Sequence, residues 1–125
     1  MTITLYGIAN CDTVKKARNW LDANATPYVF HDFKKAGIDR ALIDTWLGDL
    51  AWDVLINRKG TTWRALPDER KAAIVDAHSA TELMLASPSI IKRPVLRKDG
   101  STHVGFSDQG YQQIFGIAGK NLSVA

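Results

Sequence analysis

The first 32 residues show the order strand, helix, strand, and this order constrains the fold more than any other feature. Residues 2–8 alternate polar and apolar side chains, which predicts a strand that is at least half buried. From Asn10 to about Asn24, apolar or small residues recur at helical spacing. Residues 27–32 are rich in aromatic and β-branched residues and predict a second strand. Because β-α-β units are right-handed with parallel strands, we expect an α/β fold.

The rest of the chain changes pattern twice. Residues 38–87 have helical periodicity throughout and predict an all-helical insert. Residues 93–97 and 102–105 flank a Lys-Asp-Gly-Ser turn and predict a hairpin. Ser107 then caps a last helix that Gly116 ends, and a loose tail follows. The predicted layout is therefore β-α-β, helical insert, β-β-α.

Size and composition fit one globular domain spanning residues 1–125. A chain of 13.8 kDa with 46% hydrophobic and 23% charged residues buries enough apolar surface to exclude global disorder. No apolar run approaches the roughly 20 residues of a membrane helix, and the N-terminus lacks a basic leader, so we expect a cytoplasmic protein without membrane contact. The net charge of +3 favours small anionic partners, but its scattered basic pairs do not indicate nucleic acid binding.

Cysteine and histidine usage restricts the chemistry further. The chain has one cysteine, Cys11, which excludes an internal disulfide and any metal cage built on several thiolates. The three histidines, His31, His78 and His103, show no metal-ligand spacing. We expect no metal site and no bound cofactor.

Cys11 stands where the first predicted strand passes into the first helix. The free amides at a helix N-terminus favour a negative charge, so the pKa of a thiol there is expected to be lowered. Lys15, one turn further, is expected to add to this effect, whereas the carboxylate of Asp12 opposes it. The alternative is a buried structural cysteine, but a position between Asn10 and Asp12 in a turn favours a reactive thiol.

A second candidate is Arg93, which precedes Pro94 at the start of a predicted strand. An X-Pro bond adopts cis geometry at small cost, and such a proline turns the preceding backbone toward a neighbouring loop. The sequence does not decide between cis and trans here. Residue physics alone also does not choose Arg93 over Arg97 or Arg58 as the basic residue of the site.

Three segments, residues 6–17, 57–66 and 88–95, resemble the arsenate reductase and Spx (ArsC-like) family in order and spacing, with the nearest likeness to its YffB-like branch. The resemblance runs from residue 3 to about residue 116. It implies a thioredoxin-like (glutaredoxin-type) mixed sheet with a helical insert.

The resemblance also implies roles for individual residues. Cys11 falls on the family's nucleophilic cysteine, Lys15 on a position that is arginine in arsenate reductases, and Arg93 on their oxyanion-binding arginine, which precedes a cis-proline. These three are the expected catalytic residues. Residues expected to bind substrate or glutathione are Asn10, Asp12, Thr13, Arg58 and Pro94.

The chain departs from the family pattern at three places. One arginine of the arsenate clamp falls at Asn57 or Arg58, and another is replaced by Gly105. Each lost charge-assisted contact costs about 1.5–3 kcal/mol, which argues against arsenate as the substrate. Val14 occupies the place of the second cysteine that forms the redox switch of many Spx proteins.

Two functions are consistent with these residues. The first is a monothiol oxidoreductase, a glutathione-dependent thiol reductase in which Cys11 forms a mixed disulfide that external glutathione resolves. The alternative is an Spx-like regulatory module without a redox switch, which binds a protein partner such as RNA polymerase through its insert. The intact cysteine site favours the reductase.

Overall fold

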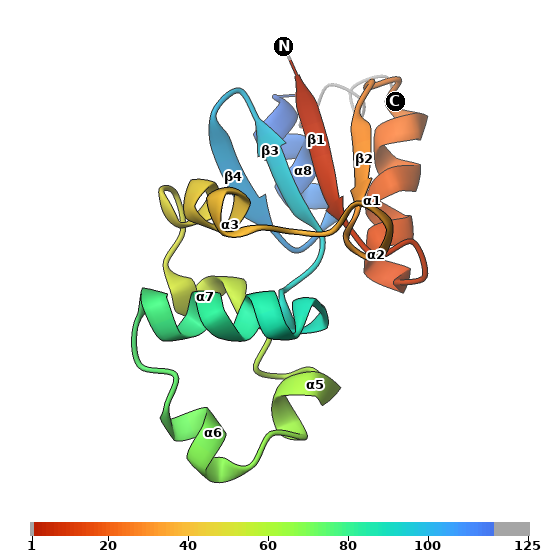
Figure 1. Cartoon of the computed structure of the whole chain (residues 1–125). Coiled ribbons are helices and arrows are strands. Elements are labelled where there is room, and N and C mark those ends of the chain that lie inside the picture. The colour runs from red at the N-terminus through yellow and green to blue at the C-terminus, as the bar shows by residue number, and fades with distance from the viewer. Residues whose placement is uncertain (1, 117–125) are drawn as a thin grey trace.

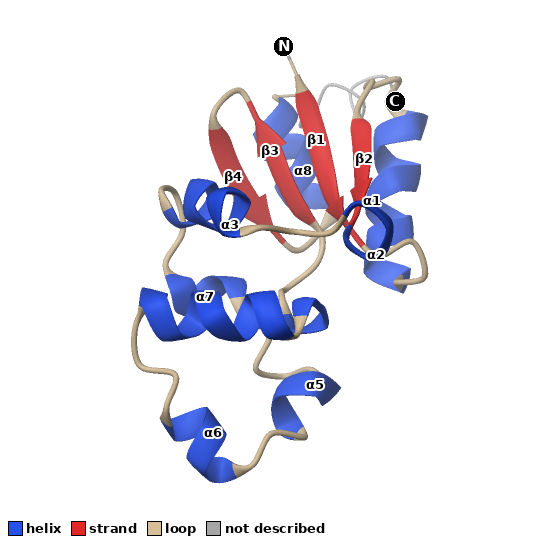
Figure 2. Cartoon of the chain, viewed as in Figure 1, coloured by secondary structure: helices blue, strands red, loops and turns tan. Residues whose placement is uncertain are grey.

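A four-stranded mixed sheet forms the centre of the fold (Figures 1 and 2). The computed structural model describes residues 2–116. The strands β1 (Ile3–Gly7), β2 (Val29–Asp32), β3 (Val95–Lys98) and β4 (Ser101–Val104) lie in the order β2-β1-β3-β4. β1 pairs with β2 in parallel and with β3 antiparallel, and β3 and β4 form the predicted hairpin. The expected tail after Gly116 lies outside the described residues.

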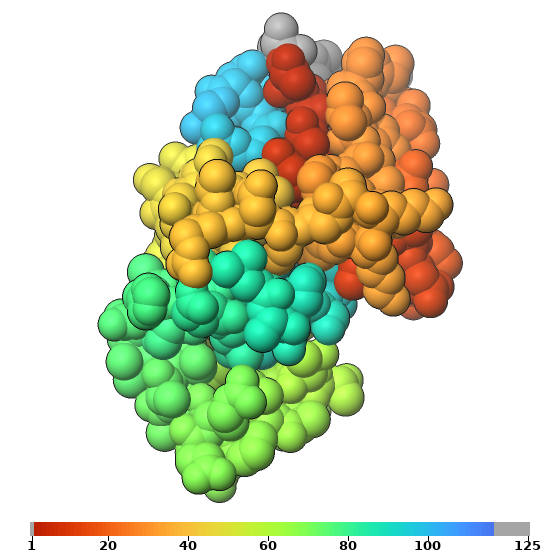
Figure 3. Space-filling view, in the orientation of Figure 1, coloured from red at the N-terminus to blue at the C-terminus, as the bar shows by residue number. Residues whose placement is uncertain are grey.

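Helices cover both faces of this sheet. α1 and α8 lie on one face, α3 crosses the other, and the remaining helices of the insert form a lobe at one end of the molecule (Figures 1 and 3). All the regular elements between residues 38 and 87 are helices. The helices are α1 (Asp12–Ala23), α2 (Phe33–Ala36), α3 (Arg40–Leu47), α4 (Trp52–Leu55), α5 (Thr61–Arg64), α6 (Asp68–Ala72), α7 (Ala77–Ala86), the 3-10 turn η1 (Pro88–Ile90) and α8 (Asp108–Phe115).

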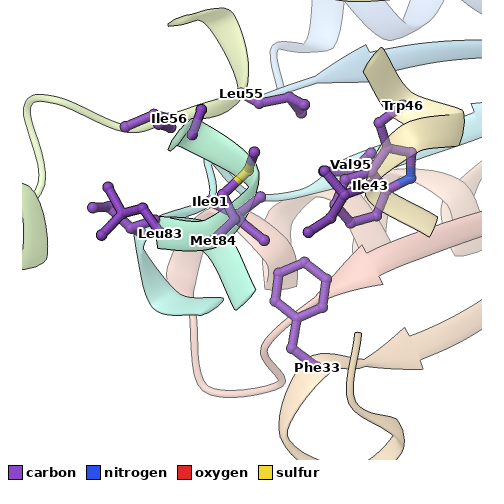
Figure 4. Close-up of a cluster of buried hydrophobic side chains, with 11 residues drawn as sticks. Phe33, Ile43, Trp46, Leu55, Ile56, Leu83, Met84, Ile91 and Val95 are labelled. Carbon is purple, nitrogen blue, oxygen red and sulfur yellow. The ribbon is translucent and has the colours of Figure 1, made fainter. Parts of the chain in front are cut away.

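Each face of the sheet has its own apolar cluster. Between the sheet and helices α1 and α8, the buried residues are Ile3, Leu5, Ala17, Trp20, Leu21, Leu96 and Tyr111. The indole N–H of Trp20 donates to Asp108 over 2.6 Å and links α1 to α8. The second cluster joins α3, α4 and α7 to the sheet; Figure 4 shows Trp46, Leu55, Met84 and Val95 among its members. The insert therefore shares a core with the sheet.

The observed arrangement is the thioredoxin-like fold with mixed sheet that the family resemblance implies. The parallel β1–β2 pair confirms the β-α-β unit. Ser107 caps α8 by accepting from the Gly110 amide, and Gly116 ends it in the left-handed region at φ 69°. The short helix α2 was not expected; the Asp32 side chain starts it by accepting from the Lys34 amide over 2.8 Å.

No helix within residues 2–116 has the length and apolar character needed to span a bilayer.

Candidate active site around Cys11

Cys11 occupies the N-cap position of α1, immediately after the loop that leaves β1. Its amide donates to the Ile8 carbonyl over 3.1 Å, and its carbonyl accepts from the Lys15 amide over 2.9 Å. These bonds fix the backbone so that the partly exposed side chain stands at the open end of the helix. Gly7 lets α1 approach this closely, because a Cβ there would lie 2.7 Å from Cγ2 of the fully buried Val14.

The surroundings of the thiol favour its ionised form. Partial burial raises the pKa of Cys11, but the Val14 amide, the Arg93 guanidinium and the Thr13 amide together outweigh it, and the pKa lies below its ordinary value. The Cys11 side chain forms no capping hydrogen bond with the helix. The amides at the start of α1 still favour a negative charge on the sulfur through their dipoles, and Arg93 adds a donor and a positive charge.

Arg93 is held in place by the backbone that precedes it. One terminal nitrogen, Nη1, donates to the Ser89 carbonyl over 2.5 Å and to the Ile91 carbonyl over 3.4 Å. Its Nε is buried and has no hydrogen-bond partner within residues 2–116. The peptide bond between Arg93 and Pro94 is cis. The guanidinium is thus anchored at one nitrogen and retains donor capacity toward the site.

A short antiparallel bridge joins the insert to the segment that leads into β3. Ile56 pairs with Ile91, the Asn57 amide donates to the Ile90 carbonyl over 2.8 Å, and the Lys92 amide donates to the Leu55 carbonyl over 2.7 Å. Asn57 and Lys92, the residues that follow the two bridge positions, line the same hollow as Cys11 and Arg93. The insert therefore contributes directly to the surroundings of Cys11.

These segments enclose an open groove of about 560 Å³. The loop from β4 to α8 forms its far wall, because the hairpin register sets Val104 opposite Val95 and the Gly105 amide donates to the Pro94 carbonyl over 2.9 Å. Gly105 has φ +79°, a conformation that favours glycine. The lining residues are Cys11, Thr13, Asn57, Lys92, Arg93, His103, Val104, Gly105, Phe106, Ser107, Gly110, Tyr111 and Ile114.

The structure brings some of the predicted site residues together and leaves others apart. Cys11, Thr13 and Arg93 line the groove. Pro94 is buried directly behind it, with its carbonyl bonded to Gly105. Three residues on or beside the first turn of α1 are exposed and outside the lining: Asn10, Asp12 and Lys15. Lys15 is not among the groups that act on the pKa of Cys11, so its expected catalytic role stays a prediction.

Of the two residues that the sequence left open, Asn57 lines the groove and Arg58 does not. The Arg58 guanidinium lies over Trp52 at 5.5 Å and Trp63 at 5.8 Å from the ring centroids. Both tryptophans are partly exposed and pack against the Arg58 guanidinium. Arg58 therefore lies outside the lining of the Cys11 groove, and its expected part in binding substrate or glutathione stays a prediction.

Several groove residues were missed by sequence reasoning. Lys92 adds a second cation beside Arg93, and its neighbouring position in the sequence was the only signal. His103 lines the groove, and burial, together with the nearby charge of Lys98, lowers its pKa against the opposing effect of Asp49. The hairpin could have been used to predict the far wall of the groove, because its register sets the end of β4 beside Pro94.

Within residues 2–116, no three His, Cys, Asp or Glu side chains gather in a way that would hold a metal ion. The chemistry visible in this groove is that of one activated thiol with two cations and several backbone amides. Fold and site together define a thioredoxin-like domain with a single cysteine at a helix N-terminus.

Comparison with known proteins identifies the family. The ArsC family profile matches residues 6–114. An uncharacterized protein of Haemophilus influenzae is 39% identical over 113 residues, which cover 90% of this chain and 98% of that protein. The solved structure of the YFFB (PA3664) protein is 50% identical, with a TM-score of 0.84 over 90% of this chain and 97% of the other. An arsenate reductase (ArsC) related protein from Brucella melitensis is 51% identical, with a TM-score of 0.75 over 92% and 95%. The chain belongs to the ArsC family.

Proposed function

We propose that this protein is a glutathione-dependent thiol reductase that works through Cys11 alone. The observation that carries the proposal is the thiol at the start of α1, which has a lowered pKa and faces an open groove with Arg93. A thiolate is the nucleophile in disulfide exchange. The fraction of a cysteine that is present as thiolate near neutral pH rises as the pKa of the thiol falls toward the ambient pH.

The proposed reaction reduces a mixed disulfide between glutathione and a substrate thiol. The Cys11 thiolate attacks the glutathione sulfur, and the disulfide bond between the glutathione sulfur and the substrate sulfur breaks. The substrate leaves as a thiolate that takes a proton from water. A second glutathione thiolate then attacks the glutathione sulfur bound to Cys11. Cys11 leaves as the thiolate, and oxidised glutathione is released. In the net exchange the substrate sulfur is reduced from the disulfide level to the thiol level, and the sulfur of the incoming glutathione is oxidised from the thiol level to the disulfide level.

The groove supports both steps. The Val14 and Thr13 amides and Arg93 favour Cys11 as a thiolate, so they assist it as nucleophile in the first step and as leaving group in the second. Lys92 and Arg93 suit the carboxylates of glutathione, and the Asn57 side chain suits its peptide groups. Glutathione spreads two carboxylates over a long body, which matches cations distributed along a groove.

The same arrangement argues against arsenate as the substrate. A compact oxyanion needs several charged donors that converge on one point, whereas Gly105 stands where an arginine of the family clamp is expected. Loss of one charge-assisted contact costs about 1.5–3 kcal/mol, or at least about tenfold in affinity.

Steady-state kinetics test this proposal. The wild-type protein is given the mixed disulfide of glutathione and a small thiol, with reduced glutathione as the electron donor, and the formation of oxidised glutathione is followed. We expect turnover that Cys11→Ser abolishes, and faster turnover with this substrate than with arsenate. Turnover that Cys11→Ser leaves intact would contradict the proposal.

A further inference from the structure

A second depression, of about 290 Å³, opens beside the Cys11 groove. Asn57 and Lys92 line both hollows, so these two side chains mark the border between them. Arg58 and Lys59 line the second depression only. A molecule longer than either hollow can therefore lie across Lys92 and contact both.

The second depression is basic. Its lining holds Arg58, Lys59 and Lys92, all exposed, against the single carboxylate of Asp53. None of the three cations forms an ion pair within residues 2–116. Their charges are therefore available to an external anion.

The local fold presents two of these cations outward. Arg58 and Lys59 occupy the middle of a turn in which the Lys59 amide donates to the Asn57 side chain over 3.2 Å and the Gly60 amide donates to the Asn57 carbonyl over 3.3 Å. The rings of Trp52 and Trp63 further restrict Arg58. Restricting a cation before binding lowers the entropy lost when an anion binds.

We infer that Arg58 and Lys59, here called the basic subsite, bind the carboxylates of an acidic polypeptide segment whose glutathionylated cysteine lies in the Cys11 groove. This inference rests on the proposed function and names its substrate class. A polypeptide continues on both sides of its cysteine, so it can reach the second depression while that cysteine lies in the Cys11 groove. Since the exchange requires a disulfide in the substrate, acidic side chains are a better match than nucleic acid phosphates.

The reacting atoms are those of the proposed exchange. Cys11 attacks the glutathione sulfur, and the polypeptide cysteine departs as a thiolate and is protonated by water. The basic subsite contacts the departing polypeptide and takes no part in the electron transfer. It affects which substrates are used, and not whether exchange occurs.

Two short synthetic peptides test the inference. Each carries one glutathionylated cysteine, flanked by glutamates in one peptide and by glutamines in the other, and release of the peptide thiol gives kcat/KM. We expect the wild-type protein to prefer the glutamate peptide by about fivefold, and the preference to shrink as salt is added. Arg58→Ala combined with Lys59→Ala should remove the preference. The control, Arg70→Ala combined with Lys71→Ala, makes the same charge change on α6, outside both hollows, and should retain it.

Equal kcat/KM for the two peptides with the wild-type protein, or equal loss in both double variants, overturns the basic subsite and leaves the proposed function standing. Absence of turnover with either peptide contradicts the proposed function instead. In that case, fluorescence anisotropy with the Cys11→Ser protein still decides the subsite. Tighter binding of the glutamate peptide, lost in the Arg58 and Lys59 double variant, supports it, and equal affinity overturns it.

Discussion

The segment before β3 and the turn at residues 57–60 each carry an arginine near the site. Arg93, in the first segment, acts on Cys11, and Arg58, in the second, does not. Arg93 is half-buried, its Nη1 donates to the carbonyls of Ser89 and Ile91, and its Nε is buried. Arg58 is exposed and lies over two tryptophan rings. The contrast shows that the groups around a guanidinium decide its role. Carbonyl anchors direct Arg93 at the thiol, while aromatic rings hold Arg58 over a neighbouring surface.

Removing the sulfur should have the largest effect. Cys11→Ser is expected to lower thiol exchange by at least about a thousandfold, because a hydroxyl neither ionises near neutral pH nor forms the mixed disulfide. Since Cys11 Sγ makes no regular capping bond, the thermal unfolding midpoint should stay close to that of the wild type. A variant that unfolds early would point to a structural cysteine.

Arg93 is expected to rank second. Arg93→Ala should raise the pKa of Cys11 and reduce kcat/KM near neutral pH by about tenfold, because one charge-assisted contact to the thiolate is lost. Arg93→Lys keeps the charge without the planar fork and should recover part of the loss. The comparison between the two arginines fails if Arg58→Ala lowers the rate with a small disulfide as much as Arg93→Ala does.

Gly7→Ala tests how closely α1 must lie against β1. The added Cβ would stand 2.7 Å from Cγ2 of Val14, which is fully buried and has no room to move. We expect the free energy of unfolding to fall by about 1–3 kcal/mol in urea titrations. Adding Val14→Ala removes the clash, so the double variant should lose less than the sum of the two single changes.

Gly60→Ala tests the turn of the insert in the same way, and we expect a smaller loss of stability than for Gly7→Ala. Here the added Cβ would lie 2.8 Å from Nδ2 of Asn57, the end of a partly exposed side chain that moves at little cost. Stability should change by less than about 1 kcal/mol. Displacing Asn57 from the groove should raise KM for the glutathione disulfide by about threefold, since one neutral hydrogen bond is weakened. An unchanged KM would remove Asn57 from the binding groove.

Lys15→Ala should have the smallest effect. Lys15 is exposed and outside the groove, so its charge acts on the thiolate only through solvent, and the exchange rate should fall by about twofold or less. A loss as large as that of Arg93→Ala would instead support the catalytic role of Lys15 that the family resemblance implies.

The residues that sequence reasoning placed correctly are those fixed by local pattern. A strand, a turn and helical spacing put Cys11 at the first turn of α1, and a Lys-Asp-Gly-Ser turn set the hairpin register. Lys92 and Arg58 could not be placed, because their positions follow from contacts between distant segments. The bridge between Ile56 and Ile91 brings Lys92 to the groove, and Arg58 packs against two tryptophan rings outside the groove lining.

The start of α1 and Arg93 favour the thiolate form of Cys11. Alkylation of the wild-type protein by iodoacetamide across a pH series tests it most directly, because the rate follows the thiolate fraction at the only cysteine. We expect the midpoint to lie below that of an unperturbed cysteine and to move upward in Arg93→Ala. A wild-type midpoint at or above the unperturbed value would contradict the claim.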